Sequence, residues 1–207
     1  MDFYQTPGSS SQATHIMLRE ASFDFRPHKV DIFSHTLEDG SDYMKVNPNG
    51  YVPALILDGR ILLTENAAIL DWVAGHSTAF LPDGASGRTR HLQMLAFIST
   101  EMQKPFIPLF FLEDPEERAR LSETLAMRFR WVGSRMEGDY IFGDRFMGAD
   151  AFLYVMLRWA AMVGIETPNA LKTFVKRVER RASVLAVLAA EGLKPLRDVD
   201  RFHGETR

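Results

Sequence analysis

The chain has 207 residues, of which 46% are hydrophobic and 25% charged, and its net charge is −3. This composition is typical of a globular protein of one large or two small domains, and the balance of charge gives no basis for binding nucleic acid or an anionic membrane. The chain contains no cysteine, which excludes disulfides, thiolate metal ligands and a cysteine nucleophile. We expect a cytoplasmic protein, because the N-terminus lacks the pattern of a signal peptide and no run approaches the ~18 apolar residues of a membrane span.

The first 75 or so residues alternate between strand and helix patterns, which predicts an α/β unit. Turn signals separate the elements, namely Pro7-Gly8, the run Asn47-Pro48-Asn49-Gly50 and Asp58-Gly59. In chain order we expect a strand at 3–4 and then a helix that is capped by Ser9, Ser10 or Ser11 and runs to about residue 21. A strand at 29–33, a polar loop at 35–40 and a short helix near 42–46 follow. Strands at 53–57 and 61–63 then form a hairpin, and a helix begins directly after it.

Glu65 and Asn66 fall where the second strand of the Asp58-Gly59 hairpin gives way to a helix. The start of a helix offers unpaired N–H groups and a partial positive charge, which favour a carboxylate. The carboxylate of Glu65 beside it is able to hold an ammonium group. This pair therefore indicates a pocket for a zwitterionic, amino-acid-like ligand, although an acidic residue in a first helical turn also suits a plain helix start.

Helical patterns dominate the rest of the chain. A Pro- and Gly-containing linker precedes them, and we place the domains at 1–78 and 88–207 with the linker at 79–87. The expected helices cover residues 88–101, 115–136, 149–164 and 168–191, followed by a polar tail from Leu196. The predicted fold class is therefore α/β first and all-α second.

Four stretches of the chain resemble the glutathione transferase superfamily, most closely its bacterial beta class. They are YQTPGSSSQATHIMLREA, DYMKVNPNGYVPALILDGRILLTENAAIL, ISTEMQKPFIPLFFLEDPEE and IFGDRFMGADAFLYVMLRWA. The resemblance covers nearly the whole chain, and the order NPxGxVPAL followed by Thr-Glu is its most specific part. It implies a thioredoxin-like N-terminal domain that binds glutathione, a helical C-terminal domain and a homodimer, with no metal.

The resemblance also implies roles for individual residues. Val52 and a cis Pro53 would pair with the backbone of glutathione, as an added strand does, whereas a proline that merely opens a strand is the alternative. Glu65 and Asn66 would hold its γ-glutamyl end. His35 stands where relatives often have a lysine that reaches the glycyl carboxylate, and a solvated loop histidine is the alternative. Lys104 would attract the thiolate or a carboxylate of glutathione.

The sequence departs from the beta-class pattern around the sulfur. Ser10 replaces the cysteine of that class, and a hydroxyl at a helix N-terminus is able to stabilise the glutathione thiolate, with Ser11 as the next candidate and plain N-caps as the alternative. Gln103 replaces a histidine and cannot act as a base. Gln5 and Ala96 replace a tyrosine and an asparagine. At Met147 the expected Ser or Thr cap of a helix is missing, although Asp150 is retained.

We therefore expect an enzyme that binds glutathione, stabilises its thiolate and conjugates it to a small hydrophobic electrophile. Apolar candidates for the second pocket are Phe106 and Trp159, followed by Phe110, Phe111 and Met162, although such stripes more often belong to a core. Two alternatives stay open. One is another glutathione-dependent reaction, such as reduction, dehalogenation or ether cleavage, and the other is a binding or regulatory protein of the same fold with little catalysis.

Overall fold

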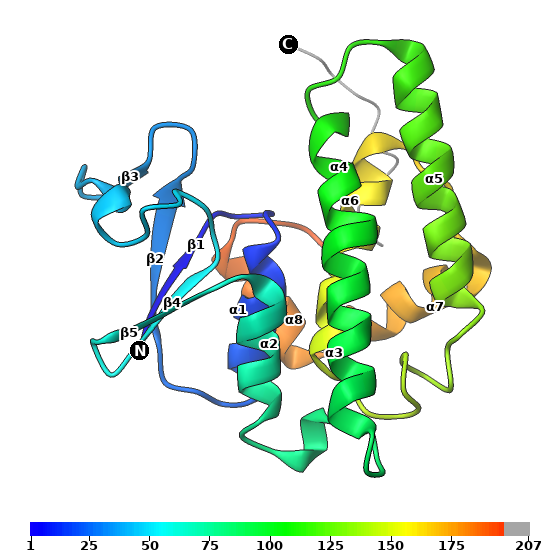
Figure 1. Cartoon of the computed structure of the whole chain (residues 1–207), viewed down its shortest axis with the longest axis horizontal. Coiled ribbons are helices and arrows are strands. Elements are labelled where there is room, and N and C mark those ends of the chain that lie inside the picture. Colours follow the sequence, from blue (N-terminus) through cyan, green and yellow to red (C-terminus); the bar gives the residue numbers. More distant parts are fainter. Residues whose placement is uncertain (197–207) are drawn as a thin grey trace.

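The structure is a computed structural model that describes residues 1–196, and its N-terminal part is built on a five-stranded sheet of order β3-β2-β1-β4-β5 (Figure 1). Strands β1 and β2 are parallel, whereas β4 runs antiparallel to both β1 and β5. The elements of this part are β1 (Asp2–Gln5), α1 (Ser11–Glu20), β2 (Arg26–Asp31), β3 (Thr36–Leu37), the 3-10 turn η1 (Tyr43–Lys45), β4 (Ala54–Leu57), β5 (Ile61–Thr64) and α2 (Asn66–Ala74).

The side-chain alternation of β1 and β4 places the two faces of the sheet in different cores. Phe3 and Leu55 pack in the large core shared with the helices, whereas Tyr4 and Ala54 pack in a small cluster beneath η1. The hairpin between β4 and β5 closes at Asp58 and Gly59, which both have positive φ angles of 47° and 67°. This is the geometry that an Asp-Gly pair favours in a two-residue hairpin turn.

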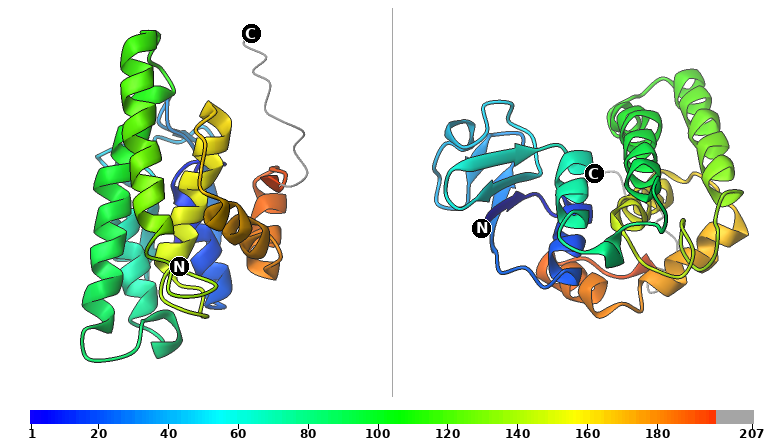
Figure 2. Two further views of the ribbon diagram at one scale, coloured as in Figure 1. Left: turned by 90° about the vertical axis from the view of Figure 1, so that its right-hand side faces the viewer. Right: turned by 60° about the horizontal axis from the view of Figure 1, so that its bottom comes forward.

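The C-terminal part is helical. After the 3-10 turn η2 (Thr78–Phe80), its elements are α3 (Gly87–Phe97), the π-helical segment η3 (Ile98–Gln103), α4 (Lys104–Leu109), α5 (Pro115–Gly133), α6 (Gly148–Val163), α7 (Asn169–Val178) and α8 (Ala182–Ala190). Figure 2 shows α8 beside α1, and α1 packs against both α6 and α8. The α6 helix is buried over thirteen consecutive positions from Gly148 to Ala160, so it forms the centre of the molecule.

Four expectations need correction. Strand β2 begins three residues earlier than expected, β3 lies in the supposed polar loop, and the first long helix continues through η3 into α4. The helix expected at 168–191 is two helices, because the chain turns at 179–181, where Glu179 is buried against Tyr154 and Arg181 pairs with Glu20. The expected tail beyond Leu196 lies outside the described residues, and the domain limits stay a prediction.

The cap of α6 is rebuilt around Met147. The Asp150 carboxylate accepts the Met147 N–H at 2.9 Å, the Met147 backbone carbonyl accepts the Asp150 N–H at 3.0 Å, and the other Asp150 oxygen accepts the Ile141 N–H. His91 adds a further acceptor, since its Nε2 lies 3.2 Å from the Ala149 nitrogen. The loss of a Ser or Thr cap is therefore offset by neighbouring groups.

Candidate functional site

A cavity of about 450 Å³ lies between the sheet part and the helical part. Its polar side comes from the loop after β1, the segment around the Val52–Pro53 bond and the start of α2. Its other side comes from η3, α4 and α6. The lining residues are Thr6, Pro7, Gly8, Ser9, Ser10, Ile32, Asn47, Asn49, Tyr51, Val52, Pro53, Thr64, Glu65, Asn66, Gln103, Ile107, Phe110, Phe111, Trp159 and Met162.

Ser10 is the N-cap residue of α1, but its side chain makes no capping hydrogen bond. Its Oγ instead accepts from Gln103 Nε2 at 3.1 Å, and only 4% of the residue is exposed. Because the Gln103 amide is the donor, the Ser10 hydroxyl hydrogen has no acceptor among residues 1–196. Ser10 therefore presents an available O–H donor at the N-terminus of a helix, beside the cavity.

Ser11, the second candidate, does not line the cavity, and this expectation is corrected. Its side chain is fully buried within the loop, where Oγ lies 2.7 Å from Ser9 Oγ and accepts the Thr6 N–H at 3.2 Å. Ser11 thus braces the turn between β1 and α1. Ser9 does line the cavity, but its Oγ is already bonded to the Ser11 hydroxyl and accepts the Ser11 N–H.

Gln103 reaches Ser10 from the end of η3. A π-helical turn holds more residues than an α-helical turn, so it rotates the side chains after it relative to an uninterrupted helix. The segment thereby aims Gln103 across the gap between the two parts of the chain. Gln103 lines the cavity, whereas Lys104, the next residue, is exposed and does not.

Glu65 stands at the start of α2 with a φ of 64° and a ψ of 120°, in the left-handed half of conformational space. A side-chain-bearing residue rarely adopts a positive φ, and such strain in native proteins concentrates at functional positions. The Glu65 carboxylate makes no capping bond and has no partner within residues 1–196. It is exposed, and it is the one charged side chain that lines the cavity in the described part of the chain.

The Asn66 side chain has a different role from the one expected. Its Nδ2 donates to the Ser10 carbonyl at 2.8 Å and its Oδ1 accepts from Thr14 Oγ1 at 2.8 Å, so the amide is used within the protein rather than left for a ligand. It ties the start of α2 to the start of α1. Asn66 lines the cavity as the first residue of α2, where backbone N–H groups have no partner within the helix.

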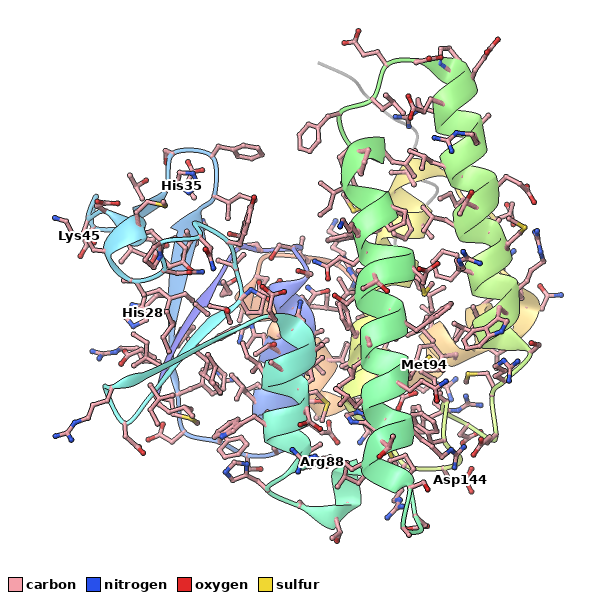
Figure 3. All side chains as sticks on the ribbon, in the orientation of Figure 1. His28, His35, Lys45, Arg88, Met94 and Asp144 are labelled. Carbon is pink, nitrogen blue, oxygen red and sulfur yellow. The ribbon has the colours of Figure 1, made fainter. Side chains whose placement is uncertain are left out.

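The Val52–Pro53 peptide bond is cis, as the resemblance implies, and both residues line the cavity. No backbone hydrogen bond involves Val52 in the described part of the chain. Its N–H and C=O are thus open to a ligand in an extended conformation. His35 does not line the cavity. It lies in the loop beyond β2 with its ring against Gly50, and its Nδ1 is buried without a partner among residues 1–196 (Figure 3).

Phe106 does not line the cavity, and that expectation is wrong. The side chain is 0% exposed and packs edge-on against Phe129 and Trp159, with ring centroids at 6.1 and 5.8 Å. Trp159 lines the cavity, and its Nε1 donates to the Gly8 carbonyl at 2.9 Å. The rest of the apolar wall consists of Ile107, Phe110, Phe111 and Met162.

Sequence reasoning missed Tyr51 and Ile107 in the lining and a buried carboxylate, Glu191, that binds the Gly8 N–H at 3.0 Å. The turn signal at 47–50 placed Tyr51 near the site, whereas no local pattern marks Glu191. Within residues 1–196, no group of three or more His, Cys, Asp or Glu residues is arranged to hold a metal ion, and no helix is long and apolar enough to cross a membrane.

A sheet with a cavity at its cis-proline corner, followed by a helical part that closes the cavity, is the fold of glutathione transferases. Family models match both parts, the "Glutathione S-transferase, N-terminal domain" over residues 8–76 and the "Glutathione S-transferase, C-terminal domain" over residues 115–190. The chain is 38% identical to "Glutathione S-transferase GstA" of Escherichia coli O157:H7, with 94% of this chain and all of that protein covered. The chain therefore belongs to the glutathione S-transferase family.

Two solved structures of glutathione S-transferases have the same fold as this chain. A sphingomonad glutathione S-transferase complexed with glutathione is 39% identical, with a TM-score of 0.85, 94% of this chain covered and 100% of the other. A bacterial beta class glutathione S-transferase of Sphingomonas chungbukensis is 36% identical, with the same TM-score and the same coverage of each chain. These comparisons confirm the predicted fold class, a thioredoxin-like domain followed by a helical one, and place the chain among the glutathione transferase-like enzymes.

Proposed function

We propose that the cavity binds glutathione and that the enzyme conjugates its sulfur to a hydrophobic electrophile. The observation that carries this proposal is the set of unsatisfied polar groups that line one cavity. A free carboxylate at Glu65, an open backbone at Val52 and a free hydroxyl hydrogen at Ser10 lie along one side of the cavity. They match, in turn, the γ-glutamyl ammonium, the cysteinyl backbone and the thiol of glutathione.

At the recognition end, the ammonium of the γ-glutamyl group pairs with Glu65 and its carboxylate meets the N–H groups that begin α2. The strained backbone of Glu65 supports this role, because such strain concentrates at functional positions and Glu65 lines the cavity without capping its own helix. At the other end, His35 and Lys104 lie outside the lining and remain candidates for the glycyl carboxylate.

At the sulfur end, Ser10 donates its free hydrogen to the thiolate, and the N-terminus of α1 adds its partial positive charge. Gln103 fixes the Ser10 hydroxyl from the opposite wall by donating to its Oγ. Both effects favour the charged form of the thiol and lower its pKa. No proton acceptor among the described lining residues touches the Ser10 oxygen, so the thiol proton leaves to solvent rather than to a built-in base.

The second substrate lies against the wall formed by Ile107, Phe110, Phe111, Trp159 and Met162. This wall offers aromatic faces and a thioether, so it favours an uncharged, hydrophobic electrophile. The thiolate attacks the electrophilic carbon, a carbon–sulfur bond forms and the leaving group takes its electron pair. Reactions that need a cysteine of the enzyme itself have no residue to carry them, since the chain has none.

The test combines calorimetry with ultraviolet titration of the bound thiolate. Wild-type protein should bind glutathione, and Ser10→Ala should raise the pKa of the bound thiol while the dissociation constant changes little. Ser11→Ala should leave that pKa where it is, because Ser11 faces the loop interior. Absence of binding at millimolar glutathione would refute the proposal. Binding without turnover of a generic aryl halide or any other electrophile would favour a binding or regulatory protein instead.

We also propose that the protein is a homodimer and acts in the cytoplasm. A hollow of about 510 Å³ between α3 and the C-terminal end of α5 supports the dimer, since it is lined by Phe97, Trp131 and Phe142 together with Arg90 and Arg135. Aromatic and arginine side chains are the types enriched at protein interfaces. A reducing compartment suits an enzyme that uses a free thiol as its co-substrate.

A further inference from the structure

Gly8, two residues before Ser10, is held through both of its backbone polar groups by the helical part of the molecule. Its N–H donates to Glu191 Oε2 at 3.0 Å, and its carbonyl accepts from Trp159 Nε1 at 2.9 Å. Glu191 directly follows α8, and Trp159 belongs to α6. Gly8 itself lines the cavity and has a φ of 72°, a conformation that glycine adopts without strain.

Glu191 also binds on the other side of Ser10. The same Oε2 accepts from Gln12 Nε2 at 2.8 Å, and Oε1 lies 2.9 Å from His15 Nδ1. Gln12 stands two residues after Ser10 in the first turn of α1. One carboxylate oxygen of Glu191 therefore binds the residues two positions before and two positions after Ser10. The second oxygen binds His15, about one turn further along α1.

The three donors depend on Glu191 because the cluster is closed to solvent. The Glu191 side chain is 0% exposed and that of His15 is 2% exposed. In the described part of the chain, Glu191 is the acceptor that the structure gives to all three donors, and His15 Nε2 and Gln12 Oε1 are buried beside it without partners of their own. Hydrogen bonds to a buried charge are short and directional, and removing that charge leaves its donors unpaired.

We propose that Glu191 is a positioning residue for the sulfur end of the site. It fixes the loop from Gly8 to Gln12 and thereby holds the Ser10 hydroxyl at the distance from Gln103 and from the thiolate that the reaction needs. This inference rests on the proposed role of Ser10. A residue that directly follows α8 thereby influences, through Gly8 and Gln12, the acidity of a thiol bound at the start of α1.

The test measures the pKa of bound glutathione and the separate kcat and KM values for an aryl halide. Glu191→Leu should raise the thiol pKa and lower kcat/KM by about 10- to 100-fold, the effect of a small misplacement at a reacting centre, while the affinity for glutathione stays within about threefold. Glu191→Gln should restore most of the loss, since one amide oxygen still accepts from Gly8 and Gln12 and its NH₂ can face an unprotonated His15 Nδ1.

Glu179→Leu is the matched control, because Glu179 is a buried carboxylate of the same helical part whose partners include Tyr154, Arg158 and Leu196. It should lower stability without moving the thiol pKa. The double variant of Ser10→Ala with Glu191→Leu should show the same thiol pKa as Ser10→Ala alone. If Ser10→Ala shifts the pKa and folded Glu191→Leu does not, the inference is overturned while the proposed function stands.

If Ser10→Ala itself leaves the thiol pKa unchanged, the proposed role of Ser10 fails, and the positioning role falls with it. Should Glu191→Leu fail to fold, Gln12→Met replaces it, because this change removes one donor to Oε2 and nearly preserves the side-chain shape. A thiol pKa in Gln12→Met equal to that of wild type would then count against the inference.

Discussion

At the scale of single residues, some polar groups of the site have all their hydrogen-bond partners within the protein, and others are free to bind a ligand. The Asn66 amide is fully used between Ser10 and Thr14, and Ser11 is fully used within its loop. Glu65 and the Ser10 hydroxyl hydrogen are not used. Unsatisfied polar groups that face one cavity are the best indication of the ligand it binds, because burial against a ligand then supplies the missing partners.

Glu65→Gln is expected to weaken glutathione binding by about 10- to 100-fold, the value of a hydrogen bond to a charged group. The amide keeps the size of the carboxylate but loses the charge that pairs with the ligand ammonium. Calorimetry measures the change in dissociation constant. Glu38→Gln, at an exposed position of the β3 end of the sheet, is the control and should bind as wild type does. Equal dissociation constants for all three proteins would exclude the assigned role of Glu65.

Local turns and strands in the stretch 47–66 indicate Glu65 and Asn66 as candidates from sequence, whereas the roles of Val52 and Pro53 came from the family resemblance and Tyr51 was missed. The serine run before a helix pattern marks a helix N-terminus, and the family resemblance singles out Ser10 within that run. Glu191 was not predictable. It contacts Gly8 across 183 positions, and a single carboxylate at the end of a helix carries no pattern that distinguishes it from a solvated one.

At the scale of elements, the π-helical segment η3 explains the one wrong assignment in the apolar wall. An α-helical projection from residue 88 onward cannot tell whether Phe106 or Ile107 faces the cavity, because the extra residues of a π turn change the phase of the helix beyond it. In the structure Phe106 turns into the core with Met102 and Leu109, and Ile107 turns out. The same phase change places Gln103 against Ser10.

The start of α6 provides a prediction about pH. His91 Nε2 accepts the Ala149 N–H and so must be unprotonated, and burial lowers the pKa of His91 from 6.5 to about 4, against a weaker opposing effect of Asp71. The unfolded chain takes up this proton as the pH falls below about 6.5, whereas the folded chain does not. The contribution of His91 to the free energy of unfolding is therefore fully present above pH ~6.5. It falls by about 3 kcal/mol as the pH drops to ~4.

His91→Gln should remove this part of the pH dependence, because glutamine accepts the same hydrogen bond at every pH. Denaturant unfolding between pH ~7 and pH ~4 measures it, with the exposed His76→Gln as control. Burial also raises the pKa of Asp150, at the same helix start, to about 7, which acts in the opposite direction. Asp150 is present in both proteins, so the difference between them isolates His91. Parallel stability curves would contradict the prediction.

At the scale of the whole molecule, the site exists only where the two parts of the chain meet. The sheet part supplies the recognition end, and the helical part supplies Gln103 and the apolar wall. Helix α1 is the common element, since it carries Ser10 at its start and packs against α6 and α8 along its length. The interface is also tied by Arg181, which pairs with Glu20 of α1 and donates to Tyr140. Changes in the helical core are thereby able to reach the sulfur end.

The hollow between α3 and α5 gives the last prediction. Met94, which is labelled in Figure 3, is one of its lining residues. The rings of Phe97 and Trp131 stack in its wall with their centroids 4.3 Å apart. The guanidinium carbon of Arg135 lies 4.4 Å from the centroid of the Trp131 ring. Arg135 has no carboxylate partner within residues 1–196. An aromatic stack covered by an unpaired arginine, in a concave surface, has the character of an interface centre that a second copy of the chain would cover.

Wild-type protein should therefore sediment as a dimer, and Trp131→Ala should shift it towards the monomer by removing the aromatic centre of that surface. Arg135→Glu should do the same without creating a void, since its side chain is exposed. Leu185→Ala, an exposed apolar position on α8, is the control and should stay dimeric. A dimer that persists in both Trp131→Ala and Arg135→Glu would place the subunit contact on another face, and a monomeric wild type would exclude the dimer altogether.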